Sequence, residues 1–261
     1  MIDGHQIWFV TFSDSRYSAW KRLKKEAVQF GCFDRVIAGD EHLFESWYKE
    51  KYKERFKDRG YGFWQWKSYL MRRELDKMNE GDILLYCDAG CSFNKKGYSR
   101  FLDYIDIVQK HKSGVLLLDQ GMDVKEWTKG DVFEYFGNQE MYSSCSQVYS
   151  GMIMISKNRT SCAMLDEWYY ICHNHYDLIT DAPSISPNYP EFIENRYDQS
   201  VLALLAIKYK VKTLPNEEVY RVDEDWSKME DKPIIATRQR NRKQSLLKIF
   251  KKKIRSIIKL K

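Results

Sequence analysis

The first half of the chain alternates short apolar runs with longer stretches in which apolar residues recur every three or four positions. The short runs are rich in aromatic and β-branched residues, which predicts buried strands. These predicted strands cover 6–12, 36–38, 83–87 and 115–118. The periodic stretches predict helices over 17–30, 41–58, 63–78 and 98–111. Strands that alternate with helices are typical of an α/β domain with a mostly parallel central sheet flanked by helices.

The second half of the chain is less regular. Residues 147–156 predict a strand that is interrupted at Ser150-Gly151, because a glycine weakens a strand. Residues 177–194 hold three of the five prolines and predict a loop. The remaining elements predicted here are a loop with a short helix over 126–137, helices over 160–173 and 198–209, and short strands over 211–214 and 233–236.

Basic residues are concentrated at the carboxyl end of the chain. The formal net charge is +6, but residues 236–261 contain 11 basic residues and no acidic one. The remainder carries 32 basic and 37 acidic residues, and this acidic balance argues against a general nucleic-acid binder. The whole chain is 43% hydrophobic, so this remainder can bury a large core, as one large domain or two small ones.

The basic end of the chain also has a helical apolar stripe. This pattern predicts a basic amphipathic helix suited to an anionic membrane surface, with a nucleic-acid arm or a calmodulin-like target as alternatives. We therefore divide the chain into a domain over 1–240 and a membrane-association tail over 241–261. The stripe consists of Leu246, Leu247, Phe250, Ile254, Ile257 and Ile258.

Neither secretion nor a resident zinc ion is indicated by the sequence. No apolar run approaches the ~20 residues that span a bilayer, and the amino end lacks the features of a signal peptide, so a cytoplasmic location is expected. The six cysteines include a CxxxC pair, Cys87 and Cys91, but no CxxC pair, so free thiols are predicted. His173 and His175 form an HxH pair, which we interpret as surface histidines.

Asp88-Ala89-Gly90 follows the predicted strand 83–87 directly. Ligands of open α/β sheets bind beyond the carboxyl ends of the strands, and a glycine there lets a ligand approach the backbone. A carboxylate at this place could hold a divalent cation that neutralises a diphosphate. The alternative is an ordinary turn, because Asp-x-Gly is common turn chemistry.

Two helix starts carry further candidates. Lys67, within the aromatic segment 60–70, could reach a phosphate, whereas Trp64 and Trp66 are expected to pack in the core. Asp198 precedes an apolar helix and is either its N-cap or a carboxylate aimed at a substrate.

Near the amino end, Asp14 or Ser15 is predicted to cap the first helix and Gly31 to end it.

Six segments in this order resemble bacterial glycosyltransferases of surface-polysaccharide clusters. The resemblance covers about residues 1–240 and implies the nucleotide-diphospho-sugar transferase fold, known as GT-A. The six segments are TFSDSRY (11–17), GYGFWQWKSYL (60–70), GDILLYCDAGCSFN (81–94), WTKGDVFEYFG (127–137), YSGMIMISKN (149–158) and NRYDQSVLALL (195–205).

The resemblance implies a donor site. Lys67 would face the diphosphate, and Asp88 with Ala89 and Gly90 would occupy the place of the family's Asp-x-Asp motif. Gly90 replaces the second aspartate, and no histidine follows the last predicted strand, so a Mn²⁺ or Mg²⁺ ion held by Asp88 is doubtful. Arg238 or Arg240 could neutralise the leaving diphosphate instead. Thr11, Phe12, Ser13 and Ser15 would meet the nucleotide base.

The resemblance also implies a reaction zone. Asp198 is the first choice for a carboxylate there and Asp131 the second, while Ser150, Gly151 and Gln199 would contact the sugar or acceptor. The expected donor is a UDP-sugar, and the expected acceptor is a lipid-linked saccharide at the inner face of the cytoplasmic membrane. Two alternatives remain: a nucleotide-sugar-binding protein that has lost its chemistry, and a nucleic-acid binder that uses the basic tail.

Overall fold

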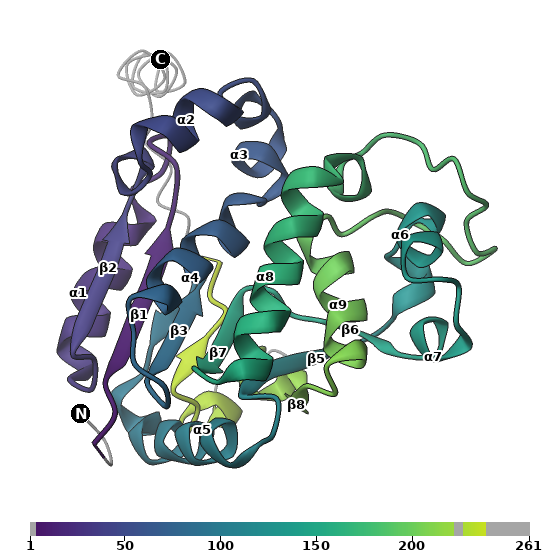
Figure 1. The fold of residues 1–261 in the computed structure, drawn as a ribbon. Helices are drawn as coiled ribbons and strands as arrows, with labels where there is room; N and C mark the ends of the chain where they lie inside the picture. The colour runs from purple at the N-terminus through teal and green to yellow at the C-terminus, as the bar shows by residue number, and fades with distance from the viewer. Residues whose placement is uncertain (1–3, 222–226, 239–261) are drawn as a thin grey trace, which may run out of the picture.

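The computed structural model describes residues 4–221 and 227–238 (Figure 1). Its strands are β1 Ile7–Phe12, β2 Arg35–Gly39, β3 Ile83–Cys87, β4 Ser92–Phe93, β5 Val115–Asp123, β6 Ser146–Val148, β7 Met152–Ser156, β8 Lys212–Leu214 and β9 Ile234–Ile235. Its helices are α1 Ala19–Phe30, α2 Ser46–Tyr52, α3 Arg59–Phe63, α4 Trp66–Asp76, α5 Tyr98–Lys110, α6 Gly130–Tyr135, α7 Glu140–Ser143, α8 Arg159–Asn174 and α9 Asp198–Lys208. Short 3-10 turns are η1 Glu41–Leu43, η2 Arg55–Lys57, η3 Lys95–Gly97, η4 Val124–Glu126, η5 Tyr176–Ile179, η6 Asn216–Glu218 and η7 Ser227–Met229.

A seven-stranded sheet forms the centre of the molecule. Its order is β2-β1-β3-β7-β5-β6, and β8 pairs with β5. The pairs β1–β2, β1–β3 and β5–β8 are parallel, whereas β7 is antiparallel to both β3 and β5. Strand β6 is antiparallel to β5, so all strands of this sheet except β6 and β7 point the same way. The predicted α/β class with a mostly parallel sheet and flanking helices is confirmed.

Alternate residues of the central strands enter two separate cores. Along β1, Trp8, Val10 and Phe12 pack with residues of α4, α8 and α9, while Ile7 and Phe9 pack with residues of α1 and α5. This alternation follows from the two-residue repeat of a strand that is covered on both faces. The helices thus form a layer on each side of the sheet (Figure 1).

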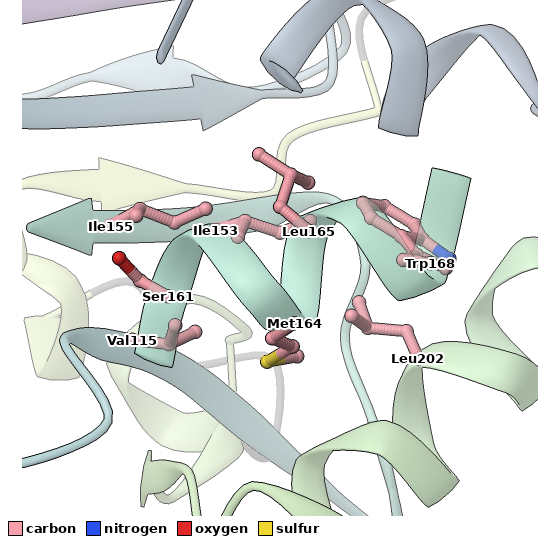
Figure 2. Close-up of a pocket in the computed structure, with 8 residues that line it drawn as sticks. All are labelled: Val115, Ile153, Ile155, Ser161, Met164, Leu165, Trp168 and Leu202. Atoms are coloured by element: carbon pink, nitrogen blue, oxygen red, sulfur yellow. The ribbon is translucent and has the colours of Figure 1, made fainter. Parts of the chain in front are cut away.

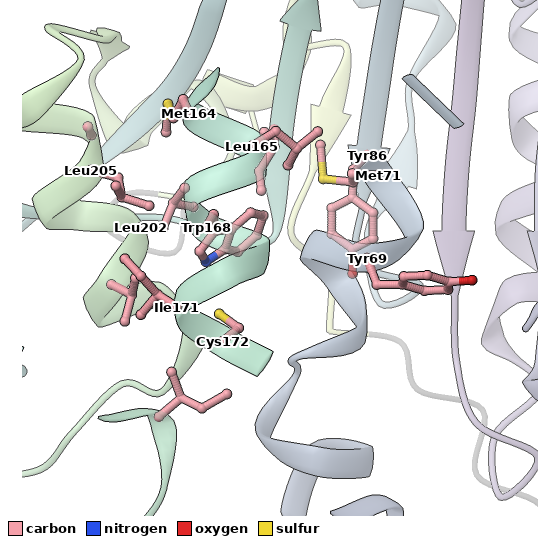
Figure 3. Close-up of a cluster of buried hydrophobic side chains, with 14 of the residues drawn as sticks. Tyr69, Met71, Tyr86, Met164, Leu165, Trp168, Ile171, Cys172, Leu202 and Leu205 are labelled. Carbon is pink, nitrogen blue, oxygen red and sulfur yellow. The ribbon is translucent and has the colours of Figure 1, made fainter. Parts of the chain in front are cut away.

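Helix α8 lies between α4 and α9 and joins them into one layer. It starts with a capping box in which Asn158 and Ser161 bond each other's backbone. Beneath it is an apolar cavity of about 10 Å³, which is too small for a substrate (Figure 2). Trp168 of α8 is 1% exposed and lies at the centre of the core cluster drawn in Figure 3. This packing fixes the start of α9 relative to α4.

Several local predictions are confirmed. Gly31 has a φ of 87° and ends α1, and the strand over 147–156 is interrupted at Ser150-Gly151 as expected. All six cysteines are free.

Within the described ranges no helix combines the length and apolarity needed to cross a bilayer. The predicted tail over 241–261 lies outside the described residues.

Other local predictions are wrong. Ser18, not Asp14 or Ser15, occupies the N-cap position of α1, because the Asp14 carboxylate instead accepts bonds from Arg16. His173 is not a surface residue: it is 3% exposed and bonded to the Tyr48 hydroxyl at 2.9 Å.

The helices over 41–58 and 63–78 were predicted too long. The first is broken into η1, α2 and η2. The second starts only at Trp66, because the preceding residues adopt a left-handed backbone.

Candidate active site

Asp88 and Ser150-Gly151 lie side by side at the edge where β3 ends. Because β7 runs antiparallel to β3, its first residue, Met152, pairs with Cys87, the last residue of β3. The Asp88 N–H donates to the Gly151 carbonyl at 2.9 Å. Two of the predicted site segments therefore meet, although about 60 residues separate them.

Lys67 joins three of the predicted segments through its ammonium group. The side chain reaches from the first turn of α4, is 1% exposed, and donates to the Ser150 carbonyl at 3.0 Å and the Ser150 hydroxyl at 3.2 Å. Its Nζ also lies 3.5 Å from Asp88 Oδ1 and 3.3 Å from Asp198 Oδ2. One buried cation thus serves two carboxylates and a carbonyl.

The three charges shift one another's protonation. Burial alone lowers the pKa of Lys67, but Asp198 and Asp88 outweigh it and the pKa is raised. Burial raises the pKa of Asp198 to about 6, against the opposing effect of Lys67. At neutral pH we therefore treat Lys67 as charged and Asp198 as ionised.

Asp198 is held by the layer of helices beneath it. It is the first residue of α9, and its carbonyl accepts a bond from Trp168 Nε1 at 3.1 Å. Tyr197, not Asp198, occupies the N-cap position, so the N-cap alternative is wrong. Among the described residues Asp198 Oδ2 has no hydrogen-bond donor, and the nearby Lys67 ammonium balances its charge.

The loop Asp88-Ala89-Gly90 is anchored from two sides. Arg22 of α1 donates to the carbonyls of Ala89 at 3.0 Å and Cys91 at 2.7 Å. Thr237, after β9, donates its hydroxyl to the Gly90 carbonyl at 2.9 Å. Asp88 keeps 39% of its side chain exposed, so it is the carboxylate that a ligand can reach.

Arg238 follows Thr237 and is exposed. Burial raises the pKa of Tyr220 to about 12, and both the charge of Arg238 and that of Asp88 act on this pKa. Arg238 directly follows Thr237, whose hydroxyl bonds the Gly90 carbonyl, and its role beside the donor loop stays a prediction. Arg240 lies outside the described residues.

The first predicted segment is only partly placed to meet a ligand. The side chains of Thr11 and Phe12 are 0% and 3% exposed and point into the interior, where Phe12 packs on Trp66 with ring centroids 4.3 Å apart. Their side chains cannot contact a nucleotide base in this arrangement, and a contact through their backbone stays a prediction. Ser15 is exposed, and Ser13 is partly exposed although its hydroxyl is buried and has no partner among the described residues. A role for these two serines in base binding stays a prediction.

Two other predicted residues have different contacts. Gln199 donates to the Gln120 side chain at 2.8 Å, beside the end of β5. Asp131 accepts backbone bonds from Ile185 and Ser186 and thereby holds the loop that precedes α9. These bonds lower the pKa of Asp131 against the effect of burial, which raises it. Asp131 does not join Lys67 in the contacts found here, and its catalytic role stays a prediction.

The donor set does not fit a tightly bound metal ion. Asp88 Oδ1 already accepts a bond from the Tyr86 hydroxyl at 2.7 Å and faces Lys67. Over 4–221 and 227–238 no three His, Cys, Asp or Glu side chains gather in a way that could hold a metal. The Lys67 ammonium, 3.5 Å from Asp88 Oδ1, would also repel a second cation at that oxygen.

Three residues at the site were missed in the sequence. Tyr86 could have been found, because residues two apart on a strand share a face and Asp88 follows it by two. Arg22 and Tyr220 carry no such signal, since their positions depend on how α1 and the segment before β9 pack against the loop.

Comparisons with known proteins give distant likenesses. No family model matches the chain, and no curated protein matches it. A glycosyltransferase involved in glycosylation of the major capsid of PBCV-1 is 9% identical, with a TM-score of 0.48 over 88% of this chain and 91% of that chain. Mouse xyloside xylosyltransferase 1, in its apo form, is 10% identical, with a TM-score of 0.45 over 94% and 89%.

The galactosyltransferase LgtC, solved with donor and acceptor sugar analogs, is 10% identical, with a TM-score of 0.43 over 87% of this chain and 86% of that chain. Because these scores are low, the function is inferred from the chain's own residues.

Proposed function

We propose that the protein is a glycosyltransferase of the GT-A type that moves a sugar from a nucleotide-diphosphate donor, with UDP-sugars as the expected class, to a saccharide acceptor. The observation that supports this most strongly is the buried Lys67, which links Asp88, Asp198 and Ser150 at the carboxyl edge of the sheet. Three separate segments that resemble the family converge on this one ammonium group.

The donor would lie across the loop Asp88-Ala89-Gly90. Its sugar or ribose hydroxyls can donate hydrogen bonds to the exposed oxygen of Asp88. The diphosphate would face Arg238, whose guanidinium matches phosphate oxygens and stays charged at every working pH. This arrangement stabilises the negative charge that develops on the leaving group.

Asp198 would stabilise the positive charge that develops on the sugar, whereas Arg238 would face the negative leaving group. Bond cleavage at the anomeric carbon builds positive charge on the sugar ring, and a fixed carboxylate nearby stabilises it. Lys67 keeps this buried carboxylate ionised at neutral pH and holds its direction. Since Arg238 would supply the positive charge at the leaving diphosphate, the proposed transfer needs no tightly bound metal ion.

The acceptor would be a lipid-linked saccharide of a bacterial surface polysaccharide. The basic apolar pattern of 241–261 supports this, because such a helix holds a protein reversibly at an anionic membrane. Liposome flotation of the full chain and of a chain that ends at residue 240 tests the idea. Only the full chain should float with anionic vesicles, and equal flotation of both would exclude the tail as an anchor.

A transfer and hydrolysis assay with nucleotide sugars tests the function. Asp88→Ala and Asp198→Ala should each lower turnover at least about 100-fold, the range seen when one electrostatic group of an active site is removed. Asp103→Ala, at an exposed position of α5, is a matched control and should leave turnover unchanged. If wild type binds a nucleotide but transfers and hydrolyses nothing, the protein is a nucleotide-sugar-binding protein of the same fold.

A further inference from the structure

Five consecutive residues before α4 have a left-handed backbone. Gly60, Tyr61, Gly62, Phe63 and Trp64 have φ angles of 64°, 60°, 88°, 46° and 61°. Non-glycine residues visit this region singly, because their Cβ approaches the next carbonyl oxygen. A full left-handed turn with three aromatic residues in it is therefore under strain, and such strain persists only where the surroundings enforce it.

The surroundings of this turn are aromatic. Tyr61 stacks on Phe56, with ring centroids 4.2 Å apart and planes 9° apart. Trp66 Nε1 donates to the Gly60 carbonyl at 3.0 Å. A Cβ on Gly60 would come within 2.5 Å of the Trp64 ring, so only glycine leaves room for that ring. The aromatic side chains of this segment therefore pack against its own backbone and against Phe56.

A second strained residue contacts the turn. Tyr197 has φ 59° and ψ −129°, a conformation that favours glycine. Its ring lies 5.2 Å from that of Phe63 and 5.2 Å from that of Trp64. Its hydroxyl accepts a bond from Arg59 at 2.5 Å. The Tyr197 side chain therefore connects the backbone at residue 197 to the left-handed segment 60–64.

Each strained segment immediately precedes the helix that carries one partner of the buried ion pair, Lys67 on α4 and Asp198 on α9. The Lys67 N–H donates to the Trp64 carbonyl at 2.9 Å, so the left-handed turn sets the start of α4. Tyr197 immediately precedes Asp198 on α9. We infer that Tyr197 is a positioning residue: its ring, held by Phe63 and Trp64, sets Lys67 against Asp198. Its effect on the ion pair is independent of the proposed function, whereas its effect on turnover rests on that function.

Chemical labelling of amines tests the positioning role without any substrate. Lys67 is almost fully buried and should react slowly with an acylating reagent, as followed by mass spectrometry. Tyr197→Gly accepts the backbone conformation but removes the ring, so the variant should fold while Lys67 reacts at least tenfold faster. Tyr197→Phe keeps the ring and should react like wild type.

Two controls separate positioning from general loosening. Lys157, whose ammonium donates to the Met78 carbonyl at the far end of α4, should react at the same rate in every variant. Lys210→Gly relieves a positive φ of 51° at the other end of α9 and should leave Lys67 protected. Unchanged labelling of Lys67 in Tyr197→Gly, or an equal rise at Lys157, would overturn the inference.

Steady-state kinetics provide the second readout. Tyr197→Gly should lower kcat at least tenfold while the donor KM changes less than threefold, and Tyr197→Phe should restore kcat. A wild-type kcat in a Tyr197→Gly variant whose Lys67 is exposed would also overturn the link to turnover. Absence of any turnover in wild type would refute the proposed function, and the labelling result would still decide the positioning role.

Discussion

Replacing Lys67 by methionine removes the one cation from a pair of carboxylates and keeps much of the side-chain volume. Asp88 is 39% exposed and can regain water, but only 4% of the Asp198 side chain is exposed. The loss of stability should therefore come mainly from leaving the buried Asp198 carboxylate without a counter-charge. Removal of one partner from a buried ion pair typically destabilises a protein by about 3–5 kcal/mol. We expect Lys67→Met to lower the free energy of unfolding at pH 7.5 by the same amount, about 3–5 kcal/mol.

The loss should depend on pH in a defined direction. Burial already raises the pKa of Asp198 to about 6, and without Lys67 this pKa should rise above 7. A folded-state pKa above the unfolded value of about 3.9 means that stability falls as pH rises through that interval. Between pH 5.5 and 7.5 the variant should lose about 1.5–2 kcal/mol more than wild type.

Urea unfolding at both pH values measures this difference. Adding Asp198→Asn to Lys67→Met removes the buried charge and should recover most of the loss at pH 7.5, and the single variants complete the cycle. A destabilisation by Lys67→Met of the same size at both pH values, with no recovery in the double variant, would refute the reasoning that Asp198 is held ionised by Lys67.

Three further predictions follow from other groups. Burial lowers the pKa of His173 to about 3, so the folded state should lose stability as pH drops below about 6.5, where the unfolded histidine gains a proton. In urea unfolding between pH 7 and 5, wild type should lose about 2 kcal/mol more free energy of unfolding than His173→Gln. An equal loss in both proteins would contradict this. Arg238→Ala should weaken nucleotide-diphosphate binding about tenfold, with a smaller loss at high salt because the residue is exposed, as calorimetry would show. EDTA should leave wild-type turnover unchanged, whereas a loss that Mn²⁺ restores would show that a metal is required.

Much of the fold could be predicted from local patterns. Buried strands such as β1 and β3 are almost entirely apolar because both faces are covered, and their lengths follow from the polar loops around them. The start of α4 could not be predicted, because tertiary contacts between aromatic rings, and not local preference, impose a left-handed turn on residues 60–64. Periodicity alone would continue that helix backwards.

The candidate site divides in the same way. Asp88 and Asp198 were identifiable because each lies at the end of a clear element. The depth of Lys67 was not, because a lysine on a helix start is ordinarily exposed, and only the packing of α4 beneath β3 and β7 buries it. The burial of the Thr11 and Phe12 side chains was not predictable either, because it depends on which elements cover the end of their strand.

The most direct test of the central claim is a thermal-shift screen of the full chain with UDP, GDP, CMP and TDP, each with and without Mn²⁺. A ligand at about 100 times its Kd stabilises the folded state by about 2.7 kcal/mol, which raises the Tm of a domain of this size by about 5–10 °C. We predict that UDP produces this rise without Mn²⁺ and that Arg238→Ala diminishes it. If none of the four nucleotides raises the Tm of wild type under either condition, the proposed nucleotide-sugar site does not exist.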